Sequence, residues 1–172
     1  DKRWYGSPAL MTTYFFPGCG FGGYCLPKDV RAIYHAAKCK GYNAALLKNI
    51  LLVNDKIKRH FVEKVYKSIT KNSKVGILGL SFKPGCDDVR ESPAKDIIKM
   101  LLGKGVKNII AYDPIAMDNF KNEYKLSIKY SDNLEGLVKR CNPLVIITAW
   151  KEFRDKRALY KNKKVIDGRY FL

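Results

Sequence analysis

The sequence predicts an α/β protein made of a long connecting helix followed by a small doubly wound domain with a parallel sheet. Apolar residues recur every three or four positions over 43–70, which is the spacing of an amphipathic helix. After residue 73, short apolar runs alternate with helical patterns, as in parallel strands joined by helices. The 172 residues, 47% of them hydrophobic, suffice for one core with an appendage or for two small domains. We therefore divide the chain into 1–72, a loop with central helices, and 73–172, the α/β domain.

The part before residue 73 predicts an irregular loop and two helices. Residues 17–23 read PGCGFGG, and four glycines with a proline favour irregular backbone. A first helix is expected over 28–40, with Pro27 at its start and Asp29 in its first turn. A second is expected over 43–70 with Asn43 as its N-cap, some 27 residues or about 40 Å long. Its apolar face is expected to hold Leu46, Ile50, Val53, Ile57, Phe61, Val65 and Ile69. Because an ordinary core helix is about half as long, we expect this one to bridge domains or to form an oligomer seam.

The part after residue 73 predicts four strands and three helices. Strands are expected over 75–80, 108–112, 144–148 and 164–167, and helices over 93–103, 119–124 and 133–141. Ser92 is expected to cap the first of these helices and Pro93 to open it. The repeated order of strand, helix and strand is typical of a doubly wound, Rossmann-like sheet with helices on both faces. In such a sheet ligands bind beyond the carboxyl ends of the strands.

Charge and cysteine content restrict the function classes. The chain has 33 Lys+Arg against 16 Asp+Glu, a net charge of +17, but the lysines are scattered rather than grouped. The plain interpretation is a solvated lysine-rich surface, and the functional one is the attraction of an anionic substrate or partner; scattered lysines are weaker evidence for nucleic-acid binding than an arginine-rich stripe would be. Five cysteines without C-x-x-C spacing indicate neither a disulfide framework nor a zinc site. With no apolar run of about 20 residues and no signal peptide, we expect no membrane span and a cytoplasmic location. The start at Asp1 without Met indicates a fragment.

Two segments carry residues that could do chemistry. The segment 79–92 follows the first expected strand and carries Lys83 and Arg90, but it lacks the G-x-G-x-x-G and P-loop motifs. On spacing alone it is either a phosphate site or a charged surface loop. Cys25 lies between the glycine-rich loop and a helix, where a thiolate nucleophile is favoured. The other interpretation of a cysteine is a small buried hydrophobe, which we adopt for Cys39 and Cys141.

The residues at 14–29, YFFPGCGFGGYCLPKD, resemble the active-site segment of the UDP-glucose/GDP-mannose dehydrogenase family. Further runs are similar to the family's pattern and occur in its order: GLSFKPG at 79–85, DDVRESP at 87–93, YDP at 112–114, AWKEF at 149–153 and DGR at 167–169. The resemblance spans nearly the whole chain and implies that 73–172 is the domain that binds the nucleotide sugar.

The resemblance implies an NAD-dependent, two-step oxidation of a sugar C6 alcohol to a carboxylate through the aldehyde. The implied substrate is UDP-glucose, with GDP-mannose as the alternative. Cys25 would attack the aldehyde carbon to give a thiohemiacetal, and the second oxidation would leave a thioester for water to hydrolyse. Asp29, about one helical turn away, would orient or activate that water. The helix over 43–70 would form the seam of a homodimer.

Residue by residue, the resemblance implies these substrate contacts: Tyr14, Phe15, Phe16, Pro17, Gly18, Gly22, Phe82, Lys83 and Arg169. Lys28 and Arg90 resemble positions that reach NAD. Each has a plainer interpretation: Lys28 a solvated lysine, Arg90 a surface ion pair with Glu91 or Asp87, Arg169 a C-terminal charge and Phe82 a core residue.

The sequence also departs from the family pattern. The family's NAD-binding domain with its G-x-G-x-x-G loop, its general-acid glutamate and its catalytic lysine segment are not in these 172 residues. Residues 1–13 match poorly, and Arg3 is only a candidate for the family arginine that reaches across a dimer. We therefore expect no dehydrogenase activity from this chain alone. A noncatalytic module that binds nucleotides or nucleic acid is the alternative from another function class.

Overall fold

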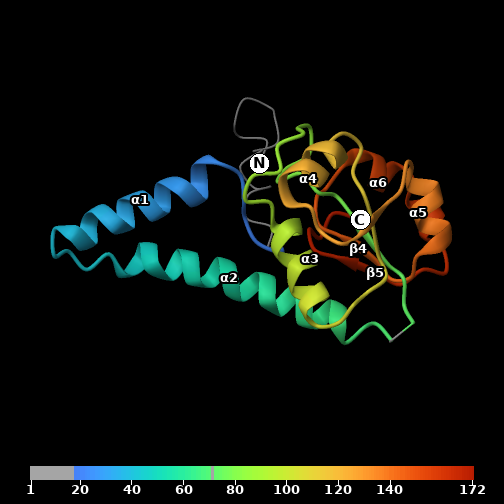
Figure 1. Ribbon diagram of the computed structural model, residues 1–172, viewed down its shortest axis with the longest axis horizontal. Helices are drawn as coiled ribbons and strands as arrows, with labels where there is room; N and C mark the ends of the chain where they lie inside the picture. Colours follow the sequence, from blue (N-terminus) through green and yellow to red (C-terminus); the bar gives the residue numbers. More distant parts are fainter. Residues whose placement is uncertain (1–17, 71) are drawn as a thin grey trace, which may run out of the picture.

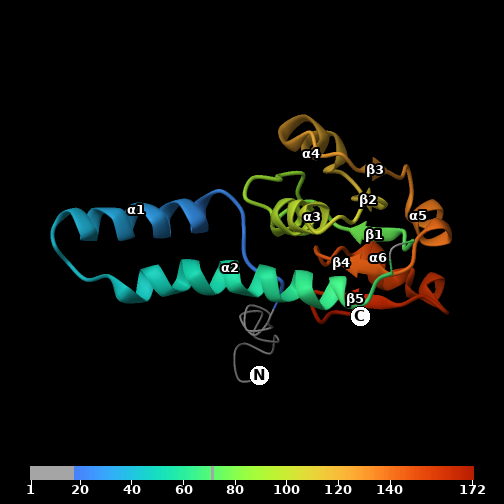
Figure 2. The same cartoon turned by 60° about the horizontal axis from the view of Figure 1, so that its bottom comes forward.

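The computed structural model describes residues 18–70 and 72–172 (Figure 1). Two antiparallel helices, α1 (Cys25–Cys39) and α2 (Ala45–Tyr66), extend from an α/β unit. The end of α1 that carries Cys25 adjoins the α/β unit, and the turn between the helices lies farthest from it (Figures 1 and 2). The α/β fold with a long helix ahead of a parallel sheet is thereby confirmed.

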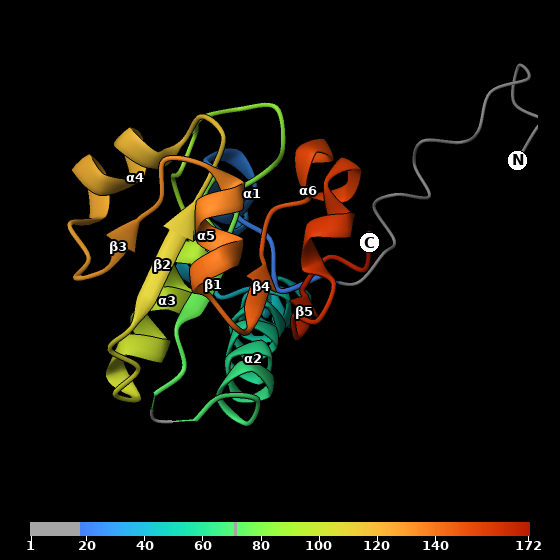
Figure 3. The same ribbon diagram turned by 90° about the vertical axis from the view of Figure 1, so that its right-hand side faces the viewer.

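The sheet has five parallel strands in the order β3-β2-β1-β4-β5 (Figure 3). The strands are β1 (Val75–Leu78), β2 (Ile109–Tyr112), β3 (Lys129–Tyr130), β4 (Leu144–Ile146) and β5 (Val165–Asp167). The central strand β1 pairs with β2 and β4, placing Ile77 beside Ala111 and Val145. All residues of β1, β2 and β4 are buried, which explains their continuous apolar sequence.

Helices cover both faces of the sheet, and successive strand residues point to opposite faces. Ile77 faces one cluster, which includes residues of α2, α3 (Pro93–Gly103) and α4 (Met117–Tyr124). Leu78 faces the other, with residues of α5 (Leu134–Arg140), α6 (Lys151–Asp155) and the 3-10 helix η2 (Arg157–Tyr160). The second half of α2 is therefore part of the α/β core, through Phe61, Val62 and Val65.

Side-chain caps position α3, as expected, and also α5, for which no cap was predicted. Ser92 Oγ accepts a hydrogen bond from the Ala94 N–H at 3.2 Å, and Pro93 is the first residue of α3. Asn133 Oδ1 accepts from the Gly136 N–H at 2.7 Å at the start of α5. Both caps satisfy N–H groups that have no partner within the helix.

The structure corrects the bounds of the first two helices. Helix α1 begins at Cys25, so that Pro27 is its third residue and Asp29 lies beyond the first turn. A proline is tolerated there because the first N–H groups of a helix have no helical partner. Helix α2 has 22 residues, and its N-cap is Ala44, without a side-chain cap from Asn43.

The predicted apolar face of α2 lies partly in the core and partly on the surface. Phe61 and Val65 are buried in the core, but Leu46 and Val53 are 74% and 52% exposed because they lie on the part that projects from the α/β unit. Cys39 is exposed, contrary to its interpretation as a buried hydrophobe, whereas Cys141 is buried as expected. All five cysteines are free.

Within 18–70 and 72–172, no helix combines the length and the apolar character needed to span a bilayer. The same residues hold no group of three or more His, Cys, Asp or Glu side chains placed to bind a metal ion.

Candidate functional site

The candidate site lies at the carboxyl edge of the sheet, between β1 and β4. From β1 the chain continues into α3 on one face, and from β4 into α6 on the other, so that the connections diverge and leave a crevice. Thr148 Oγ1 donates to the Ser81 carbonyl oxygen at 2.6 Å and joins the two loops that leave these strands. This is the topological switch point, where ligands of open α/β sheets bind.

The buried carboxylate of Asp113 fixes the loop that follows β1. Its Oδ2 accepts hydrogen bonds from Leu80 N at 2.7 Å, Ser81 N at 3.1 Å and Trp150 Nε1 at 3.0 Å. Its Oδ1 accepts from Ala116 N at 2.9 Å. Asp113 and Trp150 belong to two of the runs that resemble the family. Their hydrogen bond joins these two runs in the fold.

The loop over 18–24 crosses this edge. Its first residues bond to the segment that directly follows β5. The Cys19 N–H donates to the Gly168 carbonyl oxygen at 2.9 Å. Arg169 Nε donates to the Ile147 carbonyl oxygen at 2.5 Å, and a Cβ placed on Gly18 would lie 2.8 Å from Arg169 Nη1. Gly18 and Arg169, distant in sequence, are thus neighbours, and Arg169 is more than a C-terminal charge.

The second half of this loop packs on the segment that leads into α3. A Cβ on Gly22 would collide with the Glu91 carbonyl oxygen and lie 2.9 Å from Pro93 Cδ. The Gly23 N–H donates to the Arg90 carbonyl oxygen at 3.1 Å. Gly23 has a φ of +88°, and a Cβ there would lie 2.8 Å from the Phe82 ring. Gly22, Phe82 and Arg90 are therefore brought together, and the glycines permit the close approach.

Helix α2 holds the middle of the loop through Asn54. The Phe21 N–H donates to Asn54 Oδ1 at 2.8 Å, and Asn54 Nδ2 donates to the Phe21 carbonyl oxygen at 3.1 Å. One turn further along α2, the Lys58 ammonium binds Asp96 Oδ2 of α3 at 2.6 Å. The loop is therefore tied to α2, to the segment before α3 and to β5.

Cys25 is the first residue of α1 and is exposed, whereas Cys19 of the same loop is 1% exposed. Cys19 Sγ lies 3.8 Å from the Ile147 carbonyl oxygen, and burial raises the pKa of its thiol. A buried thiol with a raised pKa is a poor nucleophile, so that Cys25 is the thiol of this loop that a substrate can reach.

Two cations lie on either side of Tyr24, next to Cys25. Arg90 Cζ is 4.4 Å and Lys28 Nζ is 5.4 Å from the centroid of the Tyr24 ring. The Arg90 guanidinium donates hydrogen bonds to the Asp88 carboxylate, and these bonds are the main reason that the pKa of Arg90 is raised. Arg90 therefore forms an ion pair as one interpretation expected, but with Asp88 rather than with Asp87 or Glu91.

Asp29 lies one turn after Cys25 and pairs with Lys28, with 2.5 Å between Lys28 Nζ and Asp29 Oδ1. A pocket of about 320 Å³ opens beside these residues and is lined by Tyr24, Lys28, Arg31, Arg90, Glu91, Lys95, Glu123 and Tyr124. Four of its lining side chains are cationic and two are acidic, so that the pocket favours an anionic group.

The remaining predicted site residues either make few contacts with the site or lie outside the described residues. Lys83 is exposed, with its Nζ 5.4 Å from the centroid of the Phe82 ring. No hydrogen bond or ion pair holds its ammonium among the residues that the structure describes. The expected substrate contacts Tyr14, Phe15, Phe16 and Pro17, and the candidate Arg3, lie outside those residues.

Sequence reasoning missed Asn54, Asp88 and Asp113, which position the site without being exposed ligands themselves. Asn54 had a detectable signal, because it is a polar residue four positions after Ile50 in an amphipathic pattern. Asp88 and Asp113 occur within runs that resembled the family, but their partners could not be read from those runs.

Comparison with known proteins places these features in a family. Residues 76–172 match the UDP binding domain of the UDP-glucose/GDP-mannose dehydrogenase family, and residues 4–56 match its central domain. A UDP-glucose 6-dehydrogenase of Pseudomonas aeruginosa is 32% identical over 98% of this chain, which spans 40% of that protein's length.

Two solved structures have the same arrangement. A UDP-glucose dehydrogenase of Pyrobaculum islandicum has a TM-score of 0.80 at 35% identity, over 91% of this chain and 36% of its own. A GDP-mannose dehydrogenase of Pseudomonas aeruginosa has a TM-score of 0.78 at 30% identity, over 98% of this chain and 39% of its own. With more than half of its residues matched by the UDP binding domain, the chain belongs to the UDP-glucose/GDP-mannose dehydrogenase family.

Proposed function

We propose that this chain is the carboxy-terminal part of a UDP-glucose 6-dehydrogenase, an NAD-dependent cytoplasmic enzyme that oxidises UDP-glucose to UDP-glucuronate in two steps. The observation that carries the proposal is the position of Cys25. It is an exposed thiol at the first residue of a helix, next to a loop docked on the carboxyl edge of a doubly wound sheet. The chain spans about 40% of the first curated relative, so that the activity is proposed for the longer protein.

In the proposed reaction Cys25 holds the substrate between the two oxidations. Its thiolate adds to the aldehyde carbon, and the former carbonyl oxygen takes up a proton, to give a thiohemiacetal. Oxidation of this adduct leaves a thioester, which water hydrolyses to the carboxylate and the free thiol. Two features support the role of Cys25: the positive end of the α1 dipole and the nearby cations Lys28 and Arg90.

Asp29 is proposed to position the water for thioester hydrolysis. It lies one turn after Cys25 on α1, and residues four apart on a helix share a face. Its carboxylate accepts from Lys28, which leaves the second oxygen available for water. The pair keeps a carboxylate and an ammonium beside the reacting thiol.

The substrate is proposed to lie in the crevice between β1 and β4, with Gly18, Gly22, Phe82, Lys83 and Arg169 around it. The contacts of Gly18 with Arg169 and of Gly22 with the segment before α3 support this, because they join both ends of the loop to that edge. Lys83 and Arg169 would meet the diphosphate, for which paired cations are suited. Tyr14, Phe15, Phe16 and Pro17 are proposed to complete the pocket.

The residues of this chain fit the periphery of an NAD site and not the part that binds the pyrophosphate. The cationic pocket beside Cys25 fits a phosphate-bearing molecule, and Lys28 and Arg90 would contact it. The glycines at 18, 20 and 23 have the spacing G-x-G-x-x-G, but they lie in the loop docked on the carboxyl edge and not in a turn that follows one of the five described strands, where the pyrophosphate of NAD is bound. When bound, NAD accepts the hydride removed from the substrate carbon.

A homodimer through α1 and α2 is proposed from their exposed apolar residues. Leu26, Ile33, Leu46, Leu52 and Val53 are between 44% and 74% exposed on a helical pair that projects from the core. Apolar side chains gathered in this way mark an interaction surface. We propose neither a nucleic acid nor a membrane as a partner.

Binding and activity measurements test the proposal separately. Calorimetric titration of the chain with UDP-glucose should show saturable binding that Arg169→Gln weakens at least tenfold, while Arg157→Gln, on η2, leaves it unchanged. The chain alone should produce no NADH from NAD and UDP-glucose. NADH production by the pure chain, or equal binding by Arg169→Gln and the original, would contradict the proposal.

GDP-mannose is the alternative substrate, because the chain also resembles a solved GDP-mannose dehydrogenase with a TM-score of 0.78. A parallel titration with GDP-mannose decides between them. Tighter binding of GDP-mannose than of UDP-glucose would favour that alternative. Tight, salt-dependent binding of RNA without binding of either sugar nucleotide would favour the noncatalytic module.

A further inference from the structure

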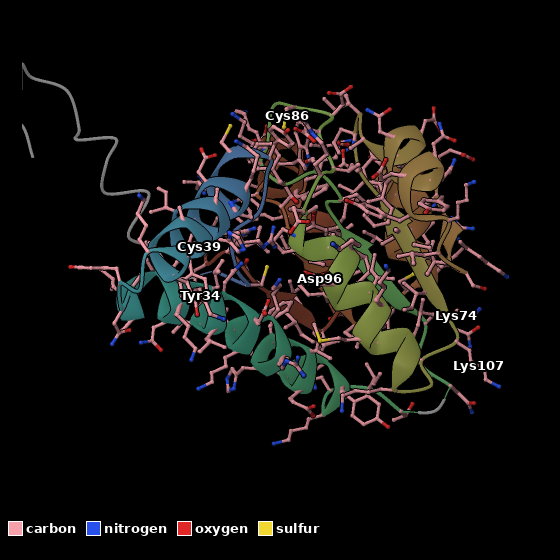
Figure 4. The ribbon with its side chains drawn as sticks, turned by 60° about the vertical axis from the view of Figure 1, so that its left-hand side comes forward. Tyr34, Cys39, Lys74, Cys86, Asp96 and Lys107 are labelled. Atoms are coloured by element: carbon pink, nitrogen blue, oxygen red, sulfur yellow. The ribbon has the colours of Figure 1, made fainter. Side chains whose placement is uncertain are left out.

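A second cationic pocket lies at the amino edge of the sheet, opposite to the candidate site. Its volume is about 460 Å³, and four cations from separate elements line it: Lys74, Lys107, Lys129 and Arg140. Lys74 directly precedes β1, Lys107 precedes β2, Lys129 opens β3 and Arg140 ends α5. Figure 4 shows Lys74 and Lys107 together at this edge, well away from Cys39 on α1.

The charges of this pocket are not balanced by the protein. No acidic side chain lines it, and within 18–70 and 72–172 none of its four cations forms an ion pair with a carboxylate. Arg140 is held in place by bonds from its Nε to the Gly136 carbonyl oxygen at 2.9 Å and from Nη2 to Ser131 Oγ at 2.7 Å. Like charges brought to one cavity repel each other, and an anion between them relieves that repulsion.

The buried thiol of Cys141 lies close to three cations, Arg140, Lys163 and Lys74. Burial raises the pKa of Cys141 to about 11, against the lowering effect of Arg140, Lys163 and Lys74. Lys163 Nζ lies 3.1 Å from the Cys141 carbonyl oxygen. The convergence of cations thus extends from the pocket to the end of α5.

The shape of the pocket selects among anions. A volume of about 460 Å³ lies within the range of small-molecule sites, whereas a nucleic-acid backbone is bound along an open groove. Part of its lining is apolar, and of its three isoleucines Ile128 is partly exposed, whereas Ile109 and Ile110 are buried in the core. A ligand that suits both features has several phosphates and a flat, weakly polar group of nucleoside size.

We propose that the pocket lined by Lys74, Lys107, Lys129 and Arg140 binds a nucleoside polyphosphate at a site separate from the one for the nucleotide sugar. The phosphates lie among the four cations and the nucleoside lies against Ile128. This proposal does not depend on the dehydrogenase activity, because it concerns the opposite edge of the sheet.

Calorimetric titration with ATP tests the proposal in the 172-residue chain. The double variant Lys107→Gln/Lys129→Gln should weaken ATP binding at least tenfold. The control Lys38→Gln/Lys48→Gln removes the same charge from exposed lysines of α1 and α2, and should change ATP binding less than twofold. Circular dichroism confirms that both double variants fold.

Further binding measurements distinguish this site from the alternatives. ATP should still bind in the presence of saturating UDP-glucose and to Arg169→Gln, and pyrophosphate should bind more weakly than ATP. Equal losses in the two double variants, or no ATP binding at 1 mM, would overturn the proposal. So would displacement of ATP by UDP-glucose, equal affinity for pyrophosphate, or preferential binding of single-stranded RNA. Failure of UDP-glucose to bind while ATP binds would count against the proposed function alone.

Discussion

The side chain of Asn54 pairs with the backbone of Phe21 through two hydrogen bonds, as a neighbouring strand would. Phe21 N–H donates to Oδ1 at 2.8 Å, and Nδ2 donates to the Phe21 carbonyl oxygen at 3.1 Å. Asn54 is 8% exposed, so that water does not readily replace it. The loop that leads to Cys25 is therefore held by a helix that begins twenty residues later.

Removal of this pair should loosen the loop. Asn54→Ala is expected to lower the free energy of unfolding by about 1–3 kcal/mol, because it leaves two buried backbone groups without partners. Amide exchange at Phe21 should accelerate, as measured by hydrogen–deuterium exchange. Asn119→Ala is the control, since Asn119 bonds only to the exposed Asp87, and it should cost less than about 0.5 kcal/mol. Unchanged exchange at Phe21 in Asn54→Ala would contradict the positioning role.

The two exposed cysteines of α1 offer a matched test of thiol reactivity. Cys25 is the first residue of the helix and Cys39 the last, where the dipole has the opposite sign. Iodoacetamide should therefore alkylate Cys25 about threefold to tenfold faster than Cys39, from a difference of about 1 kcal/mol.

Peptide mass spectrometry at pH 8 measures both rates in one sample. The buried Cys141, whose pKa is raised to about 11, should react slowest. Faster labelling of Cys39 than of Cys25 would argue against Cys25 as the nucleophile.

Gly22 should not tolerate a side chain. Its backbone is not in the left-handed region, so that Gly22→Ala tests contact alone: the methyl group meets the Glu91 carbonyl oxygen and Pro93. We expect a loss of about 1–3 kcal/mol in unfolding free energy from this overpacking, measured by urea denaturation.

Gly103→Ala is the control for Gly22→Ala. Gly103 is the last residue of α3 and has nothing within 4 Å of a Cβ, so that alanine should be neutral or stabilise by up to about 1 kcal/mol. Similar unfolding free energies for the two variants would contradict the prediction, because the loop would then accommodate a methyl group at Gly22 without cost.

The ion pair between Lys58 and Asp96 should make stability depend on pH in acid. Burial alone would raise the pKa of Asp96, but the hydrogen bond and charge of Lys58 outweigh it and lower the pKa below its ordinary value. Asp96 therefore stabilises the fold above the ordinary carboxyl pKa of about 4, and this contribution is lost as the pH falls through the lower folded pKa.

Urea unfolding of Asp96→Asn between pH 7 and pH 3 measures this effect. The variant should be about 1–3 kcal/mol less stable at pH 7, and the difference should shrink below pH 4. Asp155→Asn, which removes an exposed pair with Lys151, should differ by less than about 0.5 kcal/mol throughout. A difference between Asp96→Asn and the original chain that stays constant down to pH 3 would rule out the expected linkage.

The fold was predictable where an element is long or strongly patterned. The strands β1 and β2 and the caps Ser92 and Asn133 follow from local sequence, whereas β3 and α6 have two and five residues and are too short for a period to appear. The sequence does not show which part of the apolar face of α2 is buried in the single chain, because exposed and buried apolar residues follow the same spacing in one helix. The division of the chain at residue 72 stays a prediction.

The site was predictable where residue type signals chemistry, and not where it depends on tertiary contact. Cys25 stands out by its loop, and the structure finds it exposed. The bonds of Asn54 to Phe21 and of Asp113 to Trp150 join residues 33 and 37 positions apart. Packing alone brings such pairs together, and no local pattern encodes them.

The second half of α2 sets a limit on how this protein can be cut and recombined. The family's UDP binding domain begins at residue 76 here, yet Phe61, Val62 and Val65 fill one face of its sheet. A gene fusion that transferred only the residues after that point would leave an apolar face open to solvent. A transfer of this domain to another protein therefore keeps its core intact only if the second half of α2 is transferred with it.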